Sequence, residues 1–171
     1  MSPRPKPAPA IVIDLAMPSA RWRRSLPGVK KIATEAASAA LVQSKKRIPP
    51  AELSLVLADD AAVAALNQRW RGRAGPTNVL SFPGGDKFSG PGPRILGDVV
   101  LAYGTVSREA KAQGKTLADH ARHLIVHGVL HLLGYDHEAD GPARRMERLE
   151  TRILATLGVS DPYRVREDAH G

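Results

Sequence analysis

The sequence predicts an α+β fold in which a small, mixed sheet of four strands is packed with four to five helices. Four short apolar runs have the length and residue types of strands, and they are interspersed with longer segments in which apolar residues recur at helical spacing. One of these helical segments is apolar on more than one side, which indicates a helix at the centre of the fold. A length of 171 residues suits a single domain with a sizeable core.

The individual elements follow from these spacings and from residues that begin or end helices. A proline pair at 49–50 ends the first long helical pattern, and Asp59 or Asp60 is expected to cap the second. Thr116 stands three residues before Asp119, a capping-box arrangement at the start of the central helix. The expected elements in chain order are a strand at 11–15, a helix at 29–46, a strand at 53–57, a helix from 59 or 60 to 70, strands at 79–83 and 95–103, and helices at 105–114, 116–133 and 140–157.

The expected domain is flanked by segments that lack the pattern of a packed element. Residues 1–10 contain four prolines together with lysine and arginine and are expected to be disordered. Residues 11–158 are expected to form the single domain, and residues 159–171 a C-terminal tail. A Gly- and Pro-rich loop that ends at Pro93 is the internal segment expected to move most.

The composition indicates the kind of partner and the compartment. The net charge of +8 favours a polyanionic partner, nucleic acid before a membrane surface. The chain has no cysteine, which excludes disulfides and thiolate metal ligands and fits a reducing cytoplasm. Since the sequence shows no signal-peptide pattern and no apolar run of membrane-spanning length, we expect a soluble, cytoplasmic protein.

The chemistry of the chain is concentrated between His127 and His137. His127 and His131 are four residues apart on the expected central helix, so their imidazoles lie on one side of it, one turn apart. Gly134 tolerates a positive φ and can end the helix, which allows the chain to bring His137 back to the same point. Three neutral imidazoles favour a borderline divalent ion, most often zinc, with a fourth position for water. Packed, hydrogen-bonded histidines are the alternative, but three imidazoles buried together without an ion would leave polar atoms unsatisfied.

Such a zincin-like metal helix favours hydrolysis but leaves the substrate open. Zinc lowers the pKa of its bound water and polarises a carbonyl or phosphoryl oxygen, so peptide and phosphodiester hydrolysis both remain open. Metalloproteases with a His-Glu-x-x-His motif use the glutamate as the general base, but Gly128 occupies this position here. A structural metal is a further alternative, although structural zinc usually takes four protein ligands and three are evident here.

The histidine stretch resembles the signature of the YbeY family of bacterial endoribonucleases. It reads His-Gly-Val-Leu-His-Leu-Leu-Gly-Tyr-Asp-His and has the three histidines of the family in register. Further blocks resemble the family in the same order along the chain, and together with the histidine stretch they span residues 66–138. These blocks are Leu66-Asn67, Trp70-Arg71-Gly72, residues 76–83 and Gly97-Asp98.

The resemblance implies a zinc-dependent endoribonuclease that cleaves single-stranded RNA and acts in 16S ribosomal RNA maturation and ribosome quality control. It implies one zinc ion per chain with His127, His131 and His137 as ligands, and it implies Arg71 and His127 as catalytic residues. Ribosomal RNA and the ribosome or its proteins would be the partners. The alternatives are a metallohydrolase of another substrate, such as a peptidase, and a ribosome-associated binding protein with a structural metal.

Arg71 also has a physical argument in its favour. A phosphodiester oxygen gains negative charge when water attacks phosphorus, and a guanidinium beside the metal can stabilise this charge with two hydrogen bonds. A solvated loop charge is the alternative for this arginine. His123 is a weaker candidate for a contact of the ligands or of RNA, and a packed or surface histidine is the favoured alternative. The carboxylates of Asp98, Asp136 and Glu138 could orient a histidine or receive a proton, with ordinary loop acids as the alternative.

Overall fold

Four strands and six helices make up the part of the chain that the computed structural model describes, residues 11–44, 46, 48–84, 94–135 and 140–163. The predicted α+β class with a mixed sheet of four strands is confirmed, with one helix more than the largest number expected. The elements in chain order are β1 (Ile11–Ala16), α1 (Ala20–Ser25), α2 (Val29–Gln43), β2 (Ala51–Ala58), α3 (Asp60–Arg71), β3 (Val79–Pro83), β4 (Arg94–Ala102), α4 (Tyr103–Ala112), α5 (Leu117–Leu132) and α6 (Asp140–Thr156). The expected N-terminal segment 1–10, the loop at 85–93 and residues 164–171 of the expected tail lie outside the described residues.

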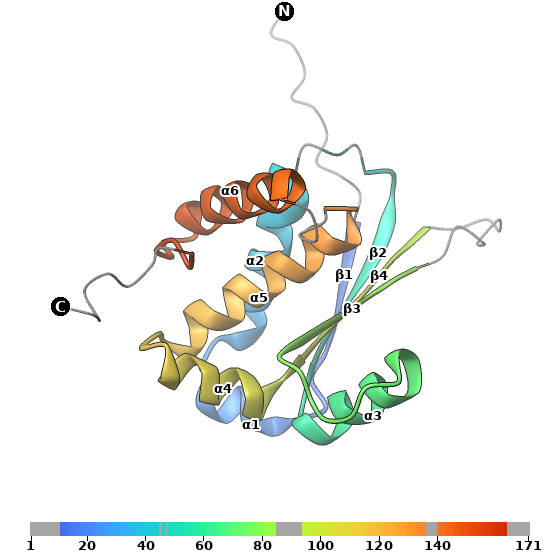
Figure 1. Cartoon of the computed structure of the whole chain (residues 1–171), viewed down its shortest axis with the longest axis vertical. Coiled ribbons are helices and arrows are strands. Elements are labelled where there is room, and N and C mark those ends of the chain that lie inside the picture. The colour runs from blue at the N-terminus through green and yellow to red at the C-terminus, as the bar shows by residue number, and fades with distance from the viewer. Residues whose placement is uncertain (1–10, 45, 47, 85–93, 136–139, 164–171) are drawn as a thin grey trace, which may run out of the picture.

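The sheet has the strand order β1-β2-β4-β3 (Figure 1). β2 pairs in parallel with β1 on one side and with β4 on the other, whereas β3 pairs antiparallel with β4. Leu55 of β2, for example, lies between Leu15 of β1 and Val99 of β4. β3 is therefore an edge strand of the sheet, next to the strand that follows it in the chain.

Two hydrophobic cores lie on opposite faces of the sheet. Leu55 and Val99 belong to the larger core, which also contains buried residues of α1, α2, α4, α5 and α6. Val100 belongs to a smaller core with Val63 of α3 and Leu80 of β3. Because successive side chains of a strand point to opposite faces, α3 covers one face of the sheet and the histidine-bearing α5 packs on the other.

α5 occupies the centre of the larger core, as its apolar sequence predicts. It packs against α2, α4 and α6 and against β3 and β4 (Figure 1). The predicted cap at its start is confirmed, since the Thr116 hydroxyl accepts a hydrogen bond from the Asp119 backbone N–H at 3.1 Å. None of the described helices is long and apolar enough to cross a membrane.

α1 is the helix that the sequence analysis did not predict. It has six residues, three of them arginines, so it carries no apolar periodicity. Trp22 fixes it in place: the side chain is fully buried, and the indole N–H donates a hydrogen bond to the Ala58 carbonyl at 2.9 Å. Its ring also packs edge-on against Tyr103, with 5.3 Å between the ring centroids. A helix this short is stable because of such tertiary contacts rather than because of its own sequence.

Candidate metal and catalytic site

α5 presents a row of four histidines along one side. His120, His123, His127 and His131 recur at intervals of three and four residues, the spacing that stacks side chains on a helix. The ring centroids of successive members are 6.3, 6.3 and 5.9 Å apart. His120 is buried and the other three are half-buried, so the row becomes accessible towards the C-terminal end of the helix, where two of the predicted ligands lie.

The end of α5 has the geometry that the sequence predicts around Gly134. This residue has a φ of +94°, in the left-handed region that glycine tolerates best. Just beyond it, the Tyr135 carbonyl lies 3.1 Å from Nδ1 of His131. Because a carbonyl oxygen can only accept, Nδ1 carries the proton of this hydrogen bond, and in a neutral imidazole the lone pair is then on Nε2. The third predicted ligand, His137, lies outside the described residues.

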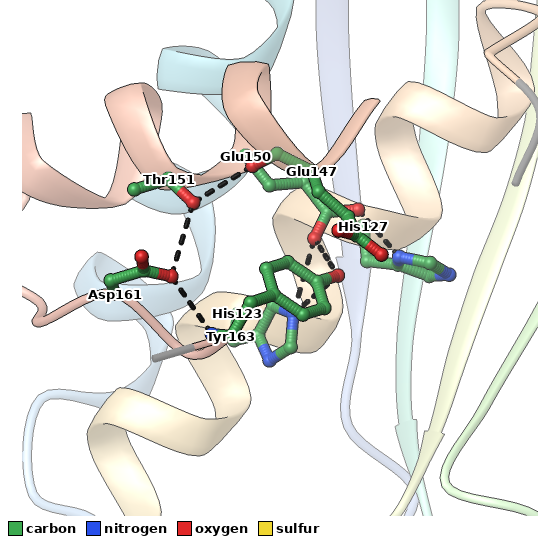
Figure 2. A network of polar contacts seen from close by, with 7 residues as sticks. All are labelled: His123, His127, Glu147, Glu150, Thr151, Asp161 and Tyr163. Atoms are coloured by element: carbon green, nitrogen blue, oxygen red, sulfur yellow. Dashed lines mark hydrogen bonds and ion pairs between the residues drawn. The ribbon is translucent and has the colours of Figure 1, made fainter. Parts of the chain in front are cut away.

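A buried carboxylate from α6 stands behind the histidine row. The side chain of Glu150 is fully buried, and its two oxygens face three donors (Figure 2). Oε1 lies 2.6 Å from Nδ1 of His127, and Oε2 lies 3.2 Å from Nε2 of His123. The Tyr163 hydroxyl donates to Oε2 as well. An ionised carboxylate is costly to bury, and the hydrogen bonds from these three donors offset that cost.

These donors also determine the charge of Glu150. Burial alone would raise the pKa of this carboxyl, but the hydrogen bonds from His123, His127 and Tyr163 outweigh burial and lower the pKa to about 2. Burial and the neighbouring Glu150 raise the pKa of the Tyr163 hydroxyl. The hydroxyl therefore stays protonated and donates a hydrogen bond to Glu150. Glu150 is thus an ionised acceptor at neutral pH. It follows that Nδ1 of His127 carries a proton, and in a neutral imidazole this leaves the lone pair on Nε2.

His123, His127 and Glu150 form a group that could hold a metal ion. Each offers one ligand atom, and these atoms lie within 4.8 Å of one another. The group shares His127 with the ligand set predicted from the sequence, but it adds a carboxylate and a histidine that the prediction did not include. The α5 histidines of both sets, His123, His127 and His131, lie on the same side of the helix.

The glycine after His127 has a steric reason. A Cβ at Gly128 would lie 2.8 Å from Cγ1 of Val99 and 3.1 Å from the hydroxyl oxygen of Ser81, closer than side chains normally approach. In addition, the Ser81 hydroxyl donates a hydrogen bond to the Gly128 carbonyl at 3.2 Å. α5 therefore lies directly on β3 and β4 at this point. The position that carries the general base in His-Glu-x-x-His proteases faces the sheet here and has no room for a side chain.

Arg71 is the last residue of α3 and lies at the free edge of the sheet. Its guanidinium donates a hydrogen bond to the Ser81 carbonyl at 3.2 Å, and its central carbon lies 5.9 Å from the centre of the Phe82 ring. Gly72, with a φ of +63°, ends the helix directly after it. Since the Ser81 hydroxyl contacts Gly128, Ser81 connects Arg71 with the helix that carries the histidines.

Asp98 is the one weaker carboxylate candidate among the described residues, and it does not lie at the histidine row. Asp98 lies on β4 at the same parity as Val100, which faces α3, so its side chain points away from α5. Asp136 and Glu138 lie outside the described residues. His123, in contrast, contacts Glu150 and flanks His127.

Sequence reasoning missed Glu150 and Tyr163. Glu150 follows Leu149 and precedes Ile153 on the helix face that was expected to be in the core. A carboxylate among core positions needs a partner, and this signal could have identified it. Tyr163 had no such signal, because its role depends on how the chain folds back after α6.

A mixed sheet packed on a helix that presents a row of histidines, with an ionised carboxylate behind them, defines an α+β protein with a zincin-like site. The family model for endoribonuclease YbeY matches residues 21–158 of the chain. The chain therefore belongs to the YbeY family of endoribonucleases, hydrolases that act on RNA, and the family resemblance of the sequence is confirmed.

Several relatives carry the name endoribonuclease YbeY. The protein of Paramagnetospirillum magneticum is 50% identical over 157 residues, which cover 90% of this chain and 94% of the relative. The protein of Azorhizobium caulinodans is 48% identical over 152 residues, which cover 88% and 95% of the two chains. The solution structure of TM1509 from Thermotoga maritima superposes with a TM-score of 0.49 at 21% identity, covering 90% of this chain and 99% of its own.

Proposed function

We propose that this protein is a zinc-dependent endoribonuclease that cleaves single-stranded RNA in the cytoplasm and acts in 16S ribosomal RNA maturation and ribosome quality control. Its family supports RNA as the substrate. The observation that carries the metal-dependent part is the orientation of His127 and His131. Both rings direct Nδ1 at a protein acceptor and therefore have the lone pair on Nε2.

The donor set suits zinc. His127 and His131, with ring centroids 5.9 Å apart, would hold the ion together with His137, and neutral imidazoles are its common ligands. Zinc held by such ligands would lower the pKa of a bound water towards neutrality, so that the water could act as a nucleophile. It would also polarise a phosphoryl oxygen as a Lewis acid. Glu150 holds His127 in the tautomer that can bind a metal, and the Tyr135 carbonyl does the same for His131.

The alternative set of His123, His127 and Glu150 fits less well. Two ligands of one tetrahedral zinc ion, each bonded at about 2.0–2.1 Å, lie about 3.3 Å apart. Oε1 of Glu150 and Nδ1 of His127 are only 2.6 Å apart, the distance of a charge-assisted hydrogen bond. An ion between them would have to break this bond, so we assign Glu150 to the support of His127.

Arg71 is the residue that we propose to stabilise charge on the phosphoryl group. Its hydrogen bond to the Ser81 carbonyl uses one of the five N–H donors of the guanidinium. The other donors form a fork that suits two phosphoryl oxygens. Because Ser81 also contacts Gly128, the residue after His127, the guanidinium is anchored to the strand that packs on the histidine helix. The close packing of Gly128 at the same time argues against a peptidase, which would need its general base at this position.

The decisive experiment combines metal analysis with RNA cleavage. The purified protein should contain about one zinc ion per chain and should cleave a single-stranded RNA faster than the same sequence in a duplex. Chelation should abolish cleavage, and added zinc should restore it. His131→Ala should lose both zinc and cleavage.

Variants of His123 and His127 distinguish the two ligand sets. With the proposed set, His127→Ala abolishes zinc binding. His123→Ala removes a hydrogen bond to Glu150 and the contacts with Tyr163 but no ligand, so it causes a smaller loss of affinity. Cleavage that persists after complete removal of the metal would contradict the proposed function.

A further inference from the structure

The C-terminal end of the described chain folds back onto α6 and reaches the site (Figure 2). Val159 is buried in the larger core. The Asp161 carboxylate accepts hydrogen bonds from the Tyr163 backbone N–H at 2.8 Å and from the Thr151 hydroxyl at 3.2 Å. These contacts hold the backbone of Tyr163 against the helix, although this segment belongs to the expected tail and the family match ends at residue 158.

Tyr163 and His127 form hydrogen bonds with different oxygens of Glu150. Its hydroxyl donates to Oε2, and its ring meets the His123 ring edge to face at 5.5 Å. Oε2 also faces Nε2 of His123 at 3.2 Å, while Oε1 faces Nδ1 of His127 at 2.6 Å. Two donors on Oε2 fix the rotation of the carboxylate, so Oε1 stays in line with His127.

We propose that Tyr163 and Glu150 are positioning residues for His127. Tyr163 fixes the Glu150 carboxylate, and the carboxylate keeps the proton of His127 on Nδ1 so that Nε2 presents its lone pair to the metal. The proposal rests on the proposed function, in which His127 is a zinc ligand. A neutral histidine in water populates both tautomers, and a partner that holds one nitrogen as a donor selects the tautomer that can bind the ion. The working unit of the enzyme therefore extends at least to Tyr163.

The test compares two variants with two matched controls. Glu150→Gln replaces one carboxylate oxygen by an amide that donates, and Tyr163→Phe removes the hydroxyl alone. Glu109→Gln is the control for the first, because Glu109 contacts another histidine of the row, His120, at 2.9 Å. Tyr103→Phe is the control for the second, because the Tyr103 hydroxyl bonds to Ser25 on α1.

Zinc affinity is measured by competition with a chelating dye, and the His127 tautomer by nitrogen NMR of the metal-free, ¹⁵N-histidine-labelled protein. Glu150→Gln should weaken zinc binding about 10- to 100-fold, and Tyr163→Phe should weaken it by a smaller factor of up to about 10. Both should move His127 from the Nδ1–H form towards the Nε2–H form. The two controls can lower the melting temperature but should leave the tautomer and the zinc affinity of the protein unchanged.

The outcomes separate this proposal from the proposed function. If His127→Ala keeps full zinc affinity, the ligand set itself is wrong. If zinc binding depends on His127 but the His127 tautomer and the affinity are the same in folded Glu150→Gln and Tyr163→Phe as in the wild type, only the positioning role is overturned. A loss in His123→Ala as complete as in His127→Ala would also overturn it, because His123 and Glu150 would then be ligands.

Discussion

Gly128→Ala tests the packing on which the histidine helix depends. This residue lies within α5, where alanine in place of glycine normally stabilises a helix by about 1 kcal/mol. At most helical positions the change would therefore raise the melting temperature. Here we expect the opposite sign, because the helix lies directly on the sheet.

The magnitude follows from two distances. The added methyl carbon would lie 2.8 Å from Cγ1 of Val99 and 3.1 Å from Oγ of Ser81. Since apolar atoms normally pack at about 3.5–4.0 Å, α5 and the strands would have to move apart by roughly 0.7 Å or more at the contact with Val99. Overpacking of a core costs about 1–3 kcal/mol, so after the gain in helix propensity the net loss is about 1 kcal/mol and at most about 2. For a chain of this size a loss of 1 kcal/mol lowers the melting temperature by about 2–4 °C.

Gly141→Ala is the matched control for this change. Gly141 also lies in a helix, but a Cβ there would meet nothing within 4 Å, so the same substitution should be neutral or slightly stabilising. Thermal and urea unfolding of both variants measure the difference. An increase in stability of Gly128→Ala equal to that of Gly141→Ala would refute the close packing of α5 on the sheet.

A double-mutant cycle with Val99→Ala tests the cause of the loss. Both Cγ atoms of Val99 lie within 3.3 Å of the position that the added methyl carbon would take, and Val99→Ala removes them. In this background Gly128→Ala should cost nothing or should stabilise the protein. We expect a coupling free energy of about 1–2 kcal/mol, within the usual range for residues in contact. Simple additivity would locate the strain elsewhere.

Three further expectations concern the reaction, the partner and the pH dependence. Arg71→Ala should lower single-turnover RNA cleavage about 10²- to 10³-fold with zinc content unchanged, and Arg71→Lys should restore only part of it; equal, small losses in Arg71→Ala and Arg73→Ala would argue against a catalytic role. RNA binding should weaken steeply between low and physiological salt, because a net charge of +8 acts through counterion release, and a flat salt dependence would remove RNA as the partner. Burial lowers the pKa of His120 more than the adjacent Glu109 raises it, so the unfolded state takes up the proton first as the pH falls. Stability from this group should be fully present above about pH 6.5 and decrease below it, and in urea unfolding the His120→Gln variant should show less of this decrease than the wild type.

The elements with a strong apolar period could be predicted from the sequence, and those that depend on a single tertiary contact could not. α5 and the four strands appear where the spacing of apolar residues places them. α1 was missed because its stability comes from Trp22, which is buried against a carbonyl 36 residues further along the chain. A local pattern carries no information about such a contact.

The site was predictable to the extent that its residues lie on one helix. The four-residue spacing of His127 and His131 placed their rings next to each other, and the sequence alone was sufficient for this. Glu150 comes from another helix, α6, and it contacts His127 only because α6 packs on α5. The sequence does not show this packing. Likewise, the sequence shows that Gly128 stands where His-Glu-x-x-His metalloproteases have a glutamate. The contact with Val99 that excludes a side chain at this position is a property of the folded sheet.

The position of β3 at the edge of the sheet has a consequence for self-association. An exposed edge offers unpaired backbone groups to a strand of another chain. Backbone hydrogen bonds to β4 are made by Asn78 and by Gly84, so in this antiparallel ladder positions 79, 81 and 83 turn their backbone groups outward.

Each of these outward positions has lost a group that an added strand would need. The Asn78 side chain accepts the Val79 N–H at 2.7 Å, Arg71 occupies the Ser81 carbonyl, and Pro83 has no N–H to offer. The edge is therefore a poor template for strand addition. Removing the guanidinium of Arg71 reopens one acceptor on this edge. We therefore expect the arginine that we propose for phosphate chemistry to disfavour edge-to-edge aggregation as well.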